Sequence, residues 1–251
     1  MKRFEGKTVL ITGASKGIGR SLVTYFIKEG AKVVTVSRSE LTDMESDVYS
    51  IISDIRNCDY IEQVLKENNF SIDILINNAG VICYENLDSV SREQIESVFG
   101  TNVISTFLLS QMIAKRMTEE KKKGVIVNTL SFAANIPSVG SGIYAASKAA
   151  LASLTRTMAA EWAPRHIRVN GYSPGVIETD MTKPAIKSNK ESMVNAIALH
   201  EIGSTEQMVK IVGFLASEDS EYMTGVNLDA SGGKFIVQNA EKAWMEEKGD
   251  E

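Results

Sequence analysis

Residues 7–30 read KTVLITGASKGIGRSLVTYFIKEG, and this stretch decides the fold. The apolar run Lys7 to Thr12 has the length and β-branched content of a buried strand, and apolar residues at helical spacing follow from Gly17 to Glu29. The turn between them contains three glycines: Gly13, Gly17 and Gly19. Because glycine lacks a Cβ, such a turn can be tight and can bring the backbone close to a ligand. The stretch therefore predicts a strand, a binding turn and a helix.

The same alternation of short apolar strands and helical patterns continues along the chain. The expected strands cover Lys7 to Thr12, Lys32 to Ser37, Val48 to Ser53, Asp73 to Asn77, Gly124 to Leu130, His166 to Tyr172 and Val226 to Asp229. The expected helices include Gly17 to Glu29, Asp59 to Asn68, Arg92 to Thr118 and Ile143 to Ala163. The pattern predicts an α/β fold of the doubly wound Rossmann type, with a seven-stranded parallel sheet flanked by helices. We expect a single domain over residues 1–251, with ligands at the carboxyl ends of the strands.

Composition excludes several other classes of protein. A net charge of -5 argues against a broad nucleic-acid surface, and we expect no nucleic-acid partner. No stretch is expected to span a membrane, and the chain begins without a signal-peptide pattern, so we expect a cytoplasmic protein. Two cysteines and two histidines stand too far apart for a zinc knuckle, and no metal site is expected: Cys58, Cys83, His166 and His200.

The glycine turn and the second strand together predict a dinucleotide. The start of a helix offers unpaired N–H groups to phosphates, so the expected contacts are Gly13, Ser15, Lys16, Gly17, Ile18 and Gly19. A glycine turn without a ligand remains the alternative, because the spacing G-x-x-x-G-x-G departs from G-x-G-x-x-G. The second strand ends in Ser37 and Arg38 rather than in an acidic residue. Since Arg38 and Lys16 could bind a 2′-phosphate, we predict NADP(H) over NAD(H); solvated surface charges are the alternative.

Tyr144 and Lys148 are four residues apart in a helical stretch and therefore share one face. An ammonium beside a phenol favours the phenolate, so we expect Lys148 to lower the pKa of Tyr144 and make it a catalytic acid or base. Taken alone, such a pair would more often serve packing. Ser131 follows the fifth expected strand, where its hydroxyl could donate to a substrate oxygen or simply form a turn.

These motifs together resemble those of the short-chain dehydrogenase/reductase family, from Lys7 to Phe235. They comprise TGASKGIG at 12–19, Asp54-Ile55, NNAG at 77–80, Asn102, Ser131, YAASK at 144–148, and Pro174-Gly175 with Thr179. The resemblance implies a catalytic set of Asn102, Ser131, Tyr144 and Lys148. It implies further cofactor contacts from Asp54, Ile55, Asn78, Ala79, Gly80, Tyr144, Lys148, Pro174, Gly175, Ile177 and Thr179.

The resemblance is strongest to the 3-oxoacyl-acyl-carrier-protein reductase branch. It implies a small carbonyl or alcohol substrate, free or bound to a carrier protein, and a homotetramer. Arg165 and Lys121 to Lys123 are expected near the mouth of the site, as a carrier contact or as solvated charge. Residues 178–202 would cover the substrate, with Met181, Pro184, Ile186, Met193, Ile197 and Leu199 as lining, while residues 238–251 form a charged tail. A sugar, steroid or secondary-metabolite ketone remains open, as does a noncatalytic nucleotide-binding module or a scaffold.

Overall fold

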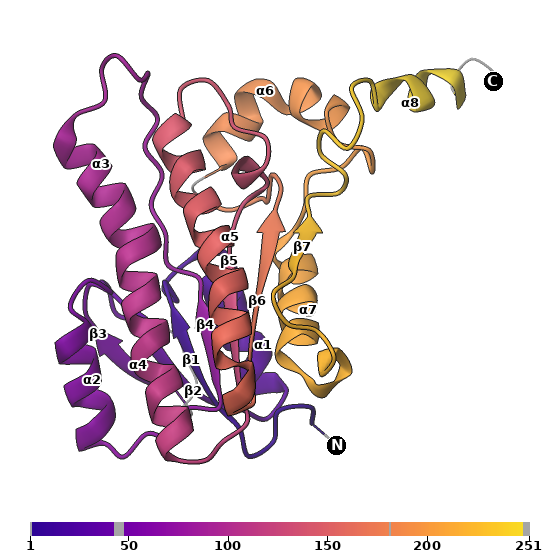
Figure 1. The fold of residues 1–251 in the computed structure, drawn as a ribbon. Coiled ribbons are helices and arrows are strands. Elements are labelled where there is room, and N and C mark those ends of the chain that lie inside the picture. Colours follow the sequence, from indigo (N-terminus) through magenta and orange to yellow (C-terminus); the bar gives the residue numbers. More distant parts are fainter. Residues whose placement is uncertain (1, 43–47, 181, 248–251) are drawn as a thin grey trace.

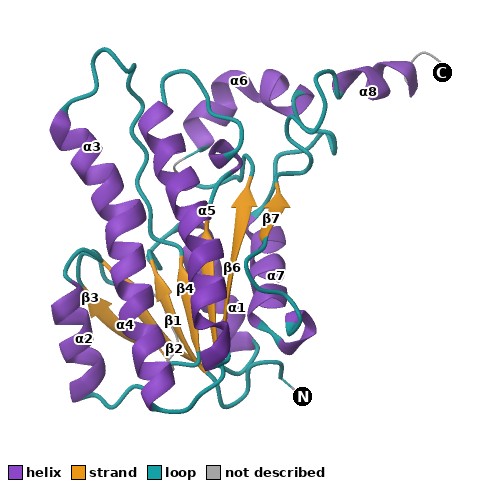
Figure 2. Ribbon diagram, in the orientation of Figure 1, coloured by secondary structure: helices purple, strands orange, loops and turns teal. Residues whose placement is uncertain are grey.

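The computed structural model describes residues 2–42, 48–180 and 182–247, without the side chains of residues 246 and 247. A seven-stranded parallel sheet lies at its centre, in the order β3-β2-β1-β4-β5-β6-β7 (Figures 1 and 2). The strands are β1 (Thr8–Thr12), β2 (Lys32–Ser37), β3 (Val48–Ile52), β4 (Ile74–Asn77), β5 (Gly124–Thr129), β6 (Ile167–Pro174) and β7 (Asn227–Ala230). The predicted fold class is therefore confirmed, with strand ends shifted by one or two residues.

Helices cover both faces of the sheet, and the sequence alternation in β1 explains why. Val9 and Ile11 pack with α1 and α7, whereas Leu10 packs on the opposite face with α2, α4 and α5. The helices are α1 (Gly17–Lys28), α2 (Cys58–Glu67), α3 (Arg92–Phe99), α4 (Thr106–Glu119), α5 (Gly142–Trp162), α6 (Lys183–Asn195), α7 (Thr205–Ala216) and α8 (Glu241–Glu247). Short 3-10 turns lie at η2 (Phe132–Ala134), η3 (Ala163–Arg165) and η4 (Glu218–Ser220).

The expected continuous helix from Arg92 to Thr118 contains an irregular turn. Between α3 and α4 lies a π-helical turn, η1 (Gly100–Ser105). Two hydroxyls bond to carbonyls five residues earlier: Ser105 Oγ donates to the Gly100 carbonyl at 2.7 Å, and Thr106 Oγ1 donates to that of Thr101 at 3.3 Å. Because π turns widen the helix and often mark functional sites, η1 is a candidate position for chemistry.

The rod formed by α3, η1 and α4 is long and apolar enough to cross a membrane by length and composition alone. Residues 92–119 include an 18-residue window of mean hydropathy 1.3, which suffices by length and composition. In the structure 44% of that window is buried, and Leu109, Ile113 and Met117 pack fully enclosed against the sheet. The apolar character therefore serves the core of a doubly wound sheet.

What we call the covering layer comprises α6 and the loop 196–202, near the carboxyl ends of the strands, and α8, which projects to the side beyond β7 (Figure 1). None of the 13 described residues of α6 is buried, and Asn189 interrupts its helical geometry. The expected tail forms α8, where Trp244 Nε1 donates to the Ala198 carbonyl at 2.9 Å and the Trp244 ring stacks on His200. The tail is thus attached to the loop that follows α6. The predicted lining residue Met181 and the tail residues 248–251 lie outside the described residues.

Candidate active site

The glycine turn after β1 is held by the end of β4. Asn78 Nδ2 donates to the carbonyls of Thr12 and Gly13, each at 3.1 Å. Thr12 Oγ1 accepts from the backbone N–H groups of Asn78 and Ala79 at 3.1 and 3.0 Å. The predicted contacts of β1 and β4 therefore form one rigid edge.

Glycine is required in this turn for two separate reasons. Gly13 has φ +66°, and a Cβ there would lie 2.7 Å from Ala79 Cα. A Cβ on Gly19 would lie 2.1 Å from the Gly13 carbonyl oxygen. Such close backbone approach at the N-terminus of α1 is the geometry that admits a pyrophosphate, so the turn fits a dinucleotide.

The cations predicted to select NADP(H) lie exposed at the same edge. Lys16 is the residue before α1, and Arg38 follows β2. Ser37 is buried, and its hydroxyl donates to the Ser39 carbonyl at 2.6 Å. Asp54 accepts a hydrogen bond from Arg56, and this bond, with the charges of Arg56 and Arg38, holds the pKa of the Asp54 carboxyl below its ordinary value. Arg38 thus lies close enough to Asp54 for its charge to act there.

The remaining predicted cofactor contacts occupy different surroundings. Ile55 is buried in the core beside β2 and β3, and Ile177 is buried where it pairs with Gly203. Thr179 Cγ2 lies 3.2 Å from the Cβ position of Gly17, which brings the loop after β6 to the glycine turn. Pro174 ends β6, and Gly175 packs against Ser231 so closely that a Cβ would lie 2.8 Å from its Cα.

Tyr144 and Ser131 interact at the carboxyl end of β5. Burial raises the pKa of the Tyr144 phenol above its ordinary value, while a hydrogen bond with Ser131 acts in the opposite direction. Because this bond lowers the pKa of the phenol, the Ser131 hydroxyl donates to the Tyr144 oxygen, and Ser131 Oγ in turn accepts from the Ala133 N–H at 3.2 Å. A substrate oxygen placed between the two hydroxyls could accept from both.

Lys148 is almost fully buried, with 3% of its surface exposed. Burial lowers the pKa of its ammonium from 10.5 to about 8, and Nζ donates to the Thr129 carbonyl at 2.7 Å. Nζ lies 5.9 Å from the centre of the Tyr144 ring. The expectation that Lys148 lowers the pKa of Tyr144 is wrong for this structure, because burial of the phenol outweighs the effect of nearby groups.

Asn102 lies in the π turn and joins this cluster to the segment after β4. Its Oδ1 accepts from the Val81 N–H at 2.9 Å, and its Nδ2 donates to the Val81 carbonyl and to Ser147 Oγ. A Cβ on Gly80 would lie 3.3 Å from Asn102 Oδ1 and 3.5 Å from Lys148 Nζ. The structure thus brings Asn102, Lys148 and the predicted NNAG segment together.

Three residues around this cluster were missed by the sequence analysis. The Thr129 carbonyl holds Lys148, Ser147 bridges Asn102 and the Tyr144 carbonyl, and the phenol of Tyr84 contributes to the raised pKa of Tyr144. Ser147 stands inside the YAASK motif, so its position could have suggested a supporting role. Tyr84 comes from a loop whose path no sequence period indicates.

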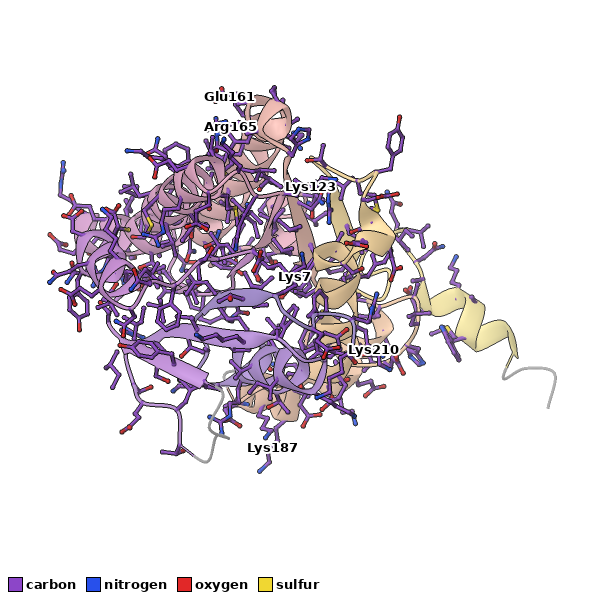
Figure 3. The ribbon with its side chains drawn as sticks, turned by 90° about the horizontal axis from the view of Figure 1, so that it is seen from below. Lys7, Lys123, Glu161, Arg165, Lys187 and Lys210 are labelled. Carbon is purple, nitrogen blue, oxygen red and sulfur yellow. The ribbon has the colours of Figure 1, made fainter. Side chains whose placement is uncertain are left out.

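The basic residues expected at the mouth lie at the opposite edge of the sheet. Lys123 directly precedes β5 and Arg165 shortly precedes β6, so both stand at the strand starts; Figure 3 views the molecule from below and labels both residues. Ser131 lies beyond the far end of β5, eight residues after Lys123 and about 26 Å away at the rise of a strand. Lys122 is also engaged, since its Nζ lies 3.0 Å from Asp73 Oδ1. The predicted placement of this basic patch is therefore wrong.

The covering layer borders a cavity of about 250 Å3 next to Phe235. It is lined by Ser192, Asn195, Ala196, Phe235, Val237, Gln238, Ala240 and Glu241. Two of the predicted lining residues, Ile197 and Leu199, belong to the adjoining loop, where Ile197 is buried and Leu199 is exposed. Ile186 is partly exposed on α6.

Comparisons with known proteins agree with this geometry. The family model of short chain dehydrogenases matches residues 7–190. The 3-oxoacyl-acyl-carrier-protein reductase FabG of Vibrio cholerae is 33% identical over 243 residues, covering 93% of this chain and 99% of that protein. A structure of 4-hydroxyisoleucine dehydrogenase with NADH is 30% identical with a TM-score of 0.88, and a mutant of such an enzyme with NADH and succinate is 33% identical with a TM-score of 0.87. Both structural matches cover 93% of this chain and 100% of the other.

Proposed function

We propose, from the premise that the chain belongs to the short-chain dehydrogenase family, that it reduces the carbonyl group of a small molecule with NADPH. As a member of that family it is a nicotinamide-dependent oxidoreductase that acts on carbonyl or hydroxyl groups. The observation that carries the proposal is the Tyr144 phenol, hydrogen bonded to Ser131 and next to the buried ammonium of Lys148. The Tyr144 phenol, whose pKa lies above its ordinary value, holds its proton at neutral pH and can serve as the donor in the reductive direction.

Each residue of the cluster has a separate task. A bound nicotinamide supplies the hydride. Ser131 donates to the substrate oxygen and orients it, and Tyr144 protonates that oxygen. Lys148, with a pKa of about 8, can return a proton to Tyr144 near neutral pH. Asn102 is a positioning residue, since its amide bonds to Val81 and Ser147.

The preference for NADPH is a proposal that rests on the exposed cations Lys16 and Arg38. The side chains are free to approach a 2′-phosphate, and the pKa of Asp54 is lowered in part by the charge of Arg38. Two of the similar structures hold NADH instead. The local charge of this chain, rather than the family, is therefore the basis for expecting NADPH.

Two substrate classes follow from the relatives. One is a 3-oxoacyl thioester on a carrier protein, as the name of the Vibrio cholerae relative states. The other is a small hydroxy or oxo acid, as suggested by 4-hydroxyisoleucine dehydrogenase, and the wrong placement of the basic patch favours this second class. By family resemblance, the proposal includes a homotetramer whose subunits contact one another through α4 and α5. It also includes a location in the cytoplasm.

The variant Tyr144→Phe tests the proposal. We expect kcat for ketone reduction to fall about 100- to 10,000-fold, while the Kd for NADPH changes less than about threefold, because only the proton donor is lost. The absorbance change on NADPH oxidation measures kcat, and fluorescence titration with NADPH measures the Kd. Retained turnover would contradict the assignment of Tyr144, and loss of both properties would indicate a structural role.

A further inference from the structure

Lys234 lies beyond β7, and the mechanism above does not use it. Its Nζ lies 5.0 Å from the ring centre of Phe132 and 5.0 Å from that of Phe235. The side chain is partly buried, and burial lowers the pKa of its ammonium. The ammonium therefore lies near two aromatic rings and is partly shielded from water.

This ammonium lacks a partner of opposite charge. Among residues 2–42, 48–180 and 182–247, no carboxylate lies within ion-pair distance of Nζ, and no oxygen accepts a hydrogen bond from it. The two rings attract the ammonium through their π faces, but they accept none of its N–H groups as a carboxylate would. The three N–H donors of Lys234 are consequently available to a ligand.

The position of Lys234 connects it with the candidate active site. Phe132 directly follows Ser131, whose hydroxyl interacts with Tyr144. The backbone of Lys234 pairs with Ile197, in the loop after α6. The ammonium thus lies between the residue that would hold the substrate carbonyl and the layer that would cover the substrate.

We propose that Lys234 binds a carboxylate carried by the substrate, so that the substrate is an oxo acid whose ketone lies at Ser131 and Tyr144. This inference rests on the proposed function and specifies its substrate class. The ammonium can form charge-assisted hydrogen bonds with a carboxylate that the small substrate itself carries. The phosphodiester of a carrier-bound arm also has one negative charge, so the location of the other basic residues is what favours the carboxylate. The basic residues that could support a carrier protein, Arg165 and Lys123, lie at the other edge of the sheet.

Paired substrates separate the role of the charge from the role of the ketone. NADPH-dependent reduction of 2-, 3-, 4- and 5-oxo carboxylates is compared with that of their methyl esters, for the wild type and for Lys234→Met. We expect the wild type to prefer the acid at one chain length. We expect Lys234→Met to lower kcat/KM for that acid about 10- to 100-fold, with the ester unchanged within about twofold. Lys234→Arg should restore part of the preference, and the exposed Lys210→Met on α7 is the control for a change in net charge.

If Lys234→Met lowers kcat/KM equally for acid and ester, or lowers it for neither, the inference about Lys234 is overturned. The proposed reaction at Tyr144 would still stand in both cases. A loss confined to phosphopantetheine thioesters, compared with pantetheine thioesters, would also overturn it in favour of a carrier-bound phosphate. Calorimetric titration with butanoate and succinate provides a readout without turnover. Binding at least tenfold weaker in Lys234→Met supports the carboxylate site, and equal binding rejects it even where no ketone is reduced.

Discussion

Two regions at the carboxyl end of the sheet are built in opposite ways. The first, which we call the site wall, consists of η1, Ser131 and the first three turns of α5, and its polar groups are buried and bonded to one another or to the end of β5. The second is the covering layer, where α6 has no buried residue among its 13 and an interrupted helix. The difference indicates that the core of the sheet fixes the reacting groups, whereas substrate choice resides in a segment that contributes little to folding.

The largest effect should come from the turn that abuts the site wall. Gly19→Ala would place a Cβ 2.1 Å from the Gly13 carbonyl oxygen, which is backbone and cannot move without displacing the turn. We expect the Kd for NADPH to rise more than about 100-fold and stability to fall by about 1–3 kcal/mol. The matched control is Gly100→Ala, where the nearest atom is 3.8 Å away. Equal effects of the two variants on NADPH binding and urea unfolding would contradict this account.

A pair of alanine variants compares the two regions directly. Leu151 is 2% exposed on α5, so Leu151→Ala should lower the free energy of unfolding by about 2–5 kcal/mol. Ile186 on α6 is partly exposed, so Ile186→Ala should lower the free energy of unfolding by less than about 1 kcal/mol. The same variant should change the KM values of different ketones relative to one another. Urea denaturation and substrate panels measure both. A large destabilisation by Ile186→Ala would mean that the covering layer belongs to the folding core.

The buried ammonium of Lys148 should make stability depend on alkaline pH. Its pKa is about 8 in the folded protein and 10.5 ordinarily, so between these values the unfolded chain binds a proton that the folded chain has lost. Stability from this group therefore increases as pH rises from about 8 to 10.5, by up to about 3 kcal/mol. Lys148→Met should remove this increase, as measured by urea midpoints across that range. The same pH dependence in wild type and variant would assign it to other groups.

The smallest effect concerns an exposed cation. Arg38→Asp should raise KM for NADPH about 10- to 30-fold and leave KM for NADH unchanged or lower, since only the 2′-phosphate contact is lost. Steady-state kinetics with both cofactors measure this ratio, and Lys187→Asp on α6 serves as a charge control. An unchanged ratio of the two KM values would mean that Arg38 is a solvated surface charge that does not contact the cofactor.

The sequence was most informative where a local pattern decides the structure. The β-branched strands, the glycine turn and the spacing of Tyr144 and Lys148 follow from periodicity and backbone sterics, and the structure contains each of them. The direction of the Tyr144 pKa could not be predicted, because burial depends on residues distant along the chain. For the same reason Arg165 and Lys123 were assigned to the wrong edge. Lys234 could not be singled out at all, since its neighbour Phe132 is far away in sequence.

The π turn also sets the rotation of α4 about its own axis, and so decides which of its side chains face the sheet. An α-helix rotates by about 100° for each residue, so the extra residue of a π turn changes which way every later side chain points. Asn102 in the turn bonds to Ser147 of α5, while Leu109, Ile113 and Met117 of α4 face the sheet. The π turn thus sets the angular position of α4 relative to α3 within one continuous helix. Deleting one residue between positions 100 and 105 would let the rod form a regular α-helix with the apolar stripe of α4 still on the sheet, but it would move Asn102 out of its hydrogen bonds. Regular α-helical geometry without a deletion would rotate the stripe away from the sheet by about 100°.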